Sequence, residues 1–221
     1  MHHEAEWGHV YVCRAATASS LPYRWAAQLP CLHDGLVPRD ASRWPRLCAW
    51  YDAMDRLPAY ACRVRGDAAS WRKVLSMAGY GNSGVPPRVL ARMDEAAAAE
   101  VFGASDVSLA TWQDYASVRP NVAATPAAEA AATILRNCKA ILADAAKRDA
   151  LEDEAELDGA LRIIATLLLD EDELTDAVPD LAMRDSVSAL AKFLDSRLCV
   201  PRDMGAPAAA ALKRLAAELN A

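Results

Sequence analysis

Apolar residues in the C-terminal half of the chain recur every three or four positions, the spacing of one face of an α-helix. This pattern predicts four helices, which start near Pro126, Glu154, Asp180 and Pro207. The first follows a cap at Thr125 and continues to Ala145, and the last follows Asp203 or Gly205-Ala206. Each apolar stripe would be exposed unless it packed on another, so we expect a small helical bundle.

Composition supports an all-α fold. Much of the 53% hydrophobic content of this 221-residue chain is alanine, a strong helix former. No apolar run approaches the roughly 18 residues of a membrane span, and residues 1–20 lack the basic-then-apolar order of a signal peptide. We therefore expect a cytoplasmic protein that binds no membrane. The net charge of −6 also disfavours nucleic acid as a partner.

The chain changes character near residue 120. All six Trp and all six Tyr precede that position, whereas the acidic excess lies after it. Such a shift is typical of a module boundary. We predict an irregular segment at 1–20, a helical domain at 21–120 and a C-terminal helical extension at 121–221.

The best-defined helix of the first half lies within 43–60, with Ser42 as its cap and Pro45 in its first turn. It ends at Leu57-Pro58, because a residue before proline avoids the helical conformation. Its predicted apolar face comprises Leu47, Trp50, Tyr51, Met54 and Leu57. We expect Trp50 and Met54 to be buried and Asp52 to be exposed.

Further helices are predicted along the rest of the first half. The patterns favour helices over 59–65, 68–78 and 86–102. Another is expected to start at a cap on Ser105 or Asp106 and to carry Trp112 and Tyr115. We also expect the terminal helix to dock on this half through Leu212, Leu215 and Leu219.

Several of these residues resemble a known family. The segments Trp44-Pro45-Arg46-Leu47, Trp50-Tyr51, Met54 and Pro58-Ala59-Tyr60 are similar to the helical C-terminal domain of glutathione transferases. The resemblance covers roughly 21–77, and the ending of the chain looks like the extension of algal and plant members. It implies a glutathione-transferase-C-like helical bundle followed by a second, Ala/Leu-rich bundle.

The resemblance also implies a function, the hydrophobic-substrate side of a glutathione transferase. Members of the family bind glutathione in a thioredoxin-like domain, for which this chain shows no strand pattern. We therefore expect weak or absent catalysis, no catalytic residue, and no cofactor unless that domain is supplied elsewhere, when glutathione would bind. The alternative is a non-enzymatic helical module whose partner is another protein or a second copy of the chain; a hydrophobic small molecule is a further candidate ligand.

Tyr23 and Trp25 are the candidate substrate-binding residues, although aromatic residues in such a stretch more often belong to a core. Other patterns favour structural interpretations. Cys31 and His33 are too close along the chain to point together, and the glycines of 79–84 match no phosphate-binding loop. The acidic run 170–176 lacks the spacing of a calcium loop.

The six cysteines form no CxxC pair, and no histidine pair has zinc-site spacing. We expect reduced thiols rather than three disulfides, and no bound metal.

Overall fold

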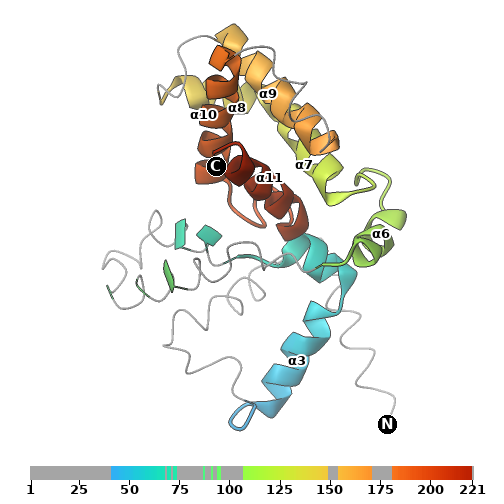
Figure 1. Cartoon of the computed structure of the whole chain (residues 1–221). Helices are drawn as coiled ribbons and strands as arrows, with labels where there is room; N and C mark the ends of the chain where they lie inside the picture. Colours follow the sequence, from blue (N-terminus) through green and yellow to red (C-terminus); the bar gives the residue numbers. More distant parts are fainter. Residues whose placement is uncertain are drawn as a thin grey trace.

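The computed structural model describes residues 41–67, 69–70, 72–73, 87, 91, 94–95, 107–148, 154–170 and 181–220. Every regular element in these parts is a helix. In chain order they are α3 (Pro45–Asp55), the π-helix η1 (Tyr60–Val64), α6 (Leu109–Ser117), α7 (Pro126–Arg136), α8 (Cys138–Ala146), α9 (Glu154–Leu169), α10 (Leu181–Arg197) and α11 (Ala206–Glu218). The protein is therefore all-α in the described parts, as the sequence predicted (Figure 1).

Four helices of the second half form a bundle. Helix α7 packs against α9 and α11, and α10 packs against the same two helices, so α7 and α10 lie diagonally opposite each other (Figure 1). One continuous apolar core lies between them. Its fully buried large side chains come from the predicted stripes: Ile134, Leu157, Leu161, Ile164, Leu167, Val187, Leu190 and Leu212.

Two predicted caps begin bundle helices as expected. The Thr125 hydroxyl accepts a hydrogen bond of 3.1 Å from the Ala128 amide, and Pro126 occupies the first turn. For α11, of the two predicted starts, the structure has Gly205 as the cap residue, with proline again in the first turn.

The predicted helix over 126–145 is divided in two at Asn137. The Asn137 side chain donates a 2.8 Å hydrogen bond to the Thr133 carbonyl, which also accepts from the Asn137 amide. A side-chain amide that binds the backbone in this way competes with the regular helical ladder. The chain therefore starts again as α8, which packs on α9.

Helix α3 begins two residues later than predicted, and one residue of its predicted apolar face is exposed. Trp44, not Ser42, is its cap residue, and Pro45 is in the first turn. Met54 is buried and Asp52 exposed as expected, but Trp50 is 37% exposed, so its predicted burial is wrong. The buried face includes Cys48 and Met54, and at about 100° per residue Trp50 lies at its margin.

The cap of α6 was also misplaced. Ser108, rather than Ser105 or Asp106, accepts a 3.1 Å hydrogen bond from the Thr111 amide. Trp112 and Tyr115 are buried as predicted and meet edge to face, with ring centroids 5.4 Å apart. They pack with Cys62 of η1 in a small cluster apart from the bundle core.

Candidate functional site

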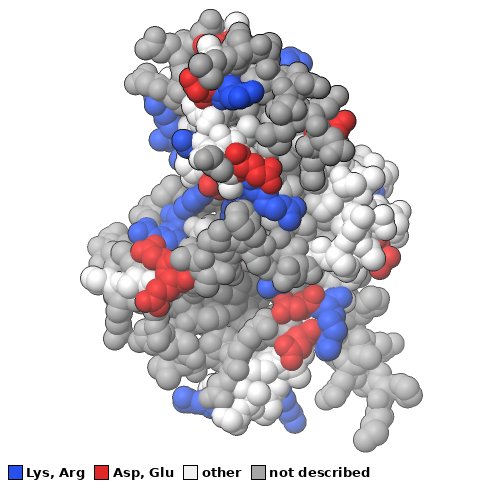
Figure 2. Space-filling view, viewed as in Figure 1, with Lys and Arg blue, Asp and Glu red and all other residues white. Residues whose placement is uncertain are grey.

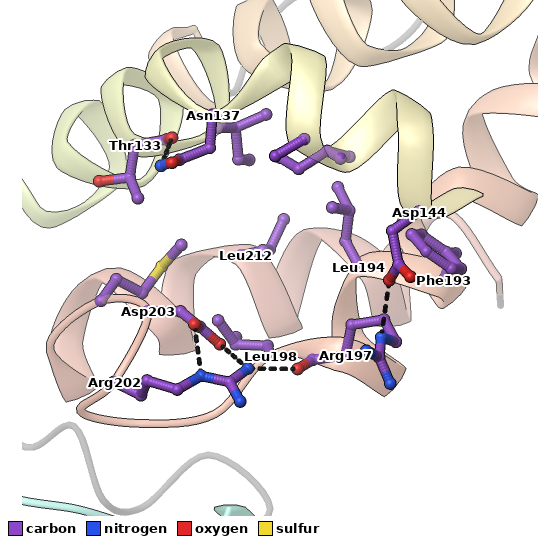
Figure 3. A pocket seen from close by; sticks show the side chains of 14 residues that line it. Thr133, Asn137, Asp144, Phe193, Leu194, Arg197, Leu198, Arg202, Asp203 and Leu212 are labelled. Carbon is purple, nitrogen blue, oxygen red and sulfur yellow. Dashed lines mark hydrogen bonds and ion pairs between the residues drawn. The ribbon is translucent and has the colours of Figure 1, made fainter. Parts of the chain in front are cut away.

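A cleft of about 370 Å³ separates α7 and α8 from the C-terminal part of α10 and the loop that follows it (Figure 3). Because α7 and α10 occupy diagonal positions, their side chains need not interdigitate here. The lining residues are Thr133, Ile134, Asn137, Ala140, Ile141, Asp144, Phe193, Leu194, Arg197, Leu198, Arg202, Asp203, Met204 and Leu212.

The floor of the cleft is apolar. Ile134 and Leu212 belong to the buried core, while Ile141 and Phe193 pack against its edge and remain partly exposed. Figure 3 shows Leu194 and Leu212 facing α7 and α8 across the cleft. An exposed apolar surface of this kind favours a ligand that removes it from water.

An ion pair spans one end of the cleft. Arg197 Nε of α10 lies 3.0 Å from Asp144 Oδ2 of α8 (Figure 3). Arg148 Nε lies 3.1 Å from Asp144 Oδ1. The hydrogen bond from Arg148 and the charge of Arg197 lower the pKa of Asp144. Both oxygens of this carboxylate therefore have cationic partners.

A second ion pair lies on the loop between α10 and α11. Arg202 donates from Nε and Nη2 to the two oxygens of Asp203, over 2.7 and 2.8 Å. Asp203 Oδ2 also accepts a 2.8 Å hydrogen bond from the Cys199 amide, which holds the loop turn. Arg202 Nη2 reaches the Arg197 carbonyl at 3.5 Å, so the two arginines are neighbours on one wall.

A separate polar cluster, which we call the junction, joins Asp67, Ser70 and Lys73 to the end of α10, the loop that follows it and α11. Lys213 Nζ of α11 lies 2.7 Å from Asp67 Oδ2, whose side chain is only 7% exposed. Asp67 Oδ1 accepts a 2.6 Å hydrogen bond from the Ser70 amide, and the buried Ser70 hydroxyl accepts a 2.6 Å bond from the Val200 amide. Burial alone would raise the pKa of Asp67, but the charge of Lys213 and the hydrogen bonds from Lys213 and Ser70 outweigh it and lower that pKa.

Lys73 completes the junction at the end of α10. Its ammonium group donates to the carbonyls of Asp195 and Leu198, over 2.6 and 3.1 Å. These carbonyls belong to the last turn of the helix and the residue beyond it, where a cation is favourable. Burial lowers the pKa of Lys73. This lysine therefore serves to hold the end of the helix.

Four cysteines lie in the described parts of the chain. Cys48, Cys62, Cys138 and Cys199 form no disulfide there. Burial raises the pKa of Cys62 to about 11, which keeps its thiol protonated at neutral pH.

The candidates named from the sequence lie largely elsewhere. Tyr23, Trp25 and the Cys31–His33 pair fall outside the described residues, as do 79–84 and nearly all of the acidic run. Sequence reasoning missed the cleft, because its walls come from segments about sixty residues apart. The arginines of its rim resemble ordinary surface charges in the sequence.

Comparisons with protein-family models, with curated proteins and with solved structures found no match to this chain. Across the described ranges, no three His, Cys, Asp or Glu side chains are placed to share a metal ion. No helix in those ranges is both long and apolar enough to cross a bilayer. On the face shown in Figure 2, basic and acidic residues of the described parts are interspersed.

Proposed function

We propose that the α7–α11 bundle is a non-enzymatic binding module whose cleft takes a small apolar molecule. The observation that carries this proposal is the cleft itself, an opening of about 370 Å³ with an apolar floor and a polar rim. Ligand pockets commonly measure about 300–1,000 Å³ and combine an apolar lining with a few polar groups.

The favourable free energy of binding comes from the apolar floor of the cleft. Water over the partly exposed side chains of Ile141 and Phe193 finds few hydrogen-bond partners there, because the charged side chains stand on the rim. A ligand that covers this surface gains about 25 cal/mol for each Å² of apolar area removed from water. Much of the cleft is built by rigid helices, so little conformational entropy is lost when it is filled.

The test is a titration with N-phenylnaphthylamine, a neutral dye whose emission rises in apolar surroundings. We expect saturable binding to the full chain. Ala140 lines the cleft from α8 and is exposed, so Ala140→Trp fills the opening without entering the core. This variant should weaken binding at least about tenfold, which corresponds to about 1.4 kcal/mol.

Ala143→Trp is the matched control, because Ala143 is exposed on the same helix but does not line the cleft. It should bind the dye as the unmodified protein does. If the dye fails to saturate, or if the two tryptophan variants bind it equally well, the cleft is not the site.

The glutathione transferase resemblance remains a separate prediction. Retention on immobilised glutathione, together with turnover of a chromogenic electrophile, would support it. A negative result in both assays would leave the cleft proposal unchanged, since the cleft lies in α7–α11 and outside residues 21–77, which carry the main resemblance.

A further inference from the structure

We infer that the ligand of the cleft is an apolar molecule with a single carboxylate group, which Arg197 and Arg202 bind at the rim. This inference rests on the proposed function and adds the chemical class of the ligand. It follows from the hydrogen-bonding capacity that the rim leaves unused.

The carboxylates of the rim are already occupied. Asp144 accepts from Arg148 and Arg197, one on each oxygen. Asp203 accepts from Nε and Nη2 of Arg202 and from the Cys199 amide. A ligand with a cationic head would therefore have to compete with arginines that hold both acidic groups.

The arginines, in contrast, have donors to spare. A guanidinium group carries five N–H donors, and among the described residues Arg197 uses only Nε, in its bond to Asp144. Arg202 uses Nε and Nη2, which leaves Nη1. The unused capacity beside the apolar floor is thus of donor type. With Arg148, three arginines stand against two aspartates there, so the group complements a carboxylate.

Position also suits this ligand. Arg197 and Arg202 lie on the same wall, and Figure 3 shows both beside the apolar residues that line the cleft. Their side chains are 41% and 55% exposed, so a head group can reach them while its tail lies on the floor. Arg148 would continue to neutralise Asp144 when Arg197 turns toward the ligand.

The experiment compares octanoate with octanamide, which share a tail and differ in head-group charge, by calorimetric titration of the full chain. We expect octanoate to bind at least about fivefold more tightly, since a charge-assisted hydrogen bond retains part of its strength at an exposed site. The double variant Arg197→Gln with Arg202→Gln should lose this preference and keep its affinity for octanamide.

Arg162→Gln is the control, because Arg162 is an exposed arginine of α9 that pairs with Asp158 and lies outside the cleft. It should retain the preference. Equal affinity for the two ligands, or a preference that survives in the double variant, would overturn the carboxylate inference while leaving apolar binding intact. Failure of both ligands to bind would overturn the proposed function as well.

Discussion

In the junction, the polar side chains of Asp67 and Ser70 are buried and their hydrogen bonds reach across more than a hundred residues of sequence. In the cleft, apolar side chains face an opening and the polar groups stand in water at its rim. Both regions include the α10–α11 loop, yet one is filled and the other is open.

This difference in burial suggests that the junction contributes mainly to stability and the cleft mainly to binding. A buried charge that loses its partner keeps the cost of having left water, so the junction should tolerate little change. An exposed rim charge returns to water when its partner is removed. We therefore expect substitutions in the junction to affect folding, and substitutions in the cleft to affect binding.

The largest effect is expected from Lys213→Met, which leaves Asp67 buried without its cation. Because breaking a buried ion pair is costly, the free energy of unfolding should fall by about 3 kcal/mol. Denaturant titration measures it. Adding Asp67→Asn removes the orphaned charge and should restore part of the loss. If Lys213→Met alone were as stable as the unmodified chain, the stability of the junction would not depend on the ion pair.

A smaller loss of stability is expected from Gly205→Ala. A Cβ at this position would lie 1.8 Å from the Cys62 carbonyl oxygen, so the start of α11 would have to move away from η1. Overpacking of this kind typically costs about 1–3 kcal/mol. The control is Gly159→Ala in α9, where the new Cβ meets the flexible end of the Met183 side chain, at 3.4 Å from Cε and 4.0 Å from Sδ. Because glycine is unfavourable inside a helix, Gly159→Ala should raise the free energy of unfolding by about 0.5–1 kcal/mol. Thermal unfolding of both variants tests the contrast, and equal melting temperatures would contradict it.

Acid should weaken the junction gradually. The pKa of Asp67 is lowered in the folded protein, so its contribution is complete above the ordinary aspartate pKa and is lost as the pH falls through the lower, folded value. The stability difference between the unmodified chain and Asp67→Asn should thus be constant near neutral pH and shrink below about pH 4. Denaturant titrations across this range measure it, and a constant difference down to strong acid would refute the assignment.

Local signals in the sequence were sufficient for most of the bundle. The cap at Thr125, the proline at Pro207 and the apolar spacing of the helix that starts near Glu154 each act within one helix, and the structure confirms them. Asn137 was different, because its side chain interrupts a helix whose apolar pattern continues across the break. Trp50 was mispredicted because the buried face of α3 includes Cys48, which the predicted stripe left out, and Trp50 lies at the margin of that face.

The site could not be predicted in the same way. Asp67 and Lys213 are 146 positions apart, and neither has a neighbour in sequence that indicates the other. The cleft depends on which helices become diagonal in the bundle, and this is decided by packing between all four. Each of its walls appears in the sequence as an ordinary amphipathic helix.

The smallest effect on folding is expected from a substitution in the cleft. This substitution tests most directly whether the cleft differs from the junction. Ala140→Trp adds a large side chain to an opening rather than to the core, and exposed substitutions usually change stability by no more than about 0.5 kcal/mol. The unfolding midpoint should therefore match that of Ala143→Trp, while dye binding differs between them. A marked loss of stability in Ala140→Trp alone would mean that α8 closes on α10 in solution. In that case the two regions would not differ, and the cleft would be part of the core.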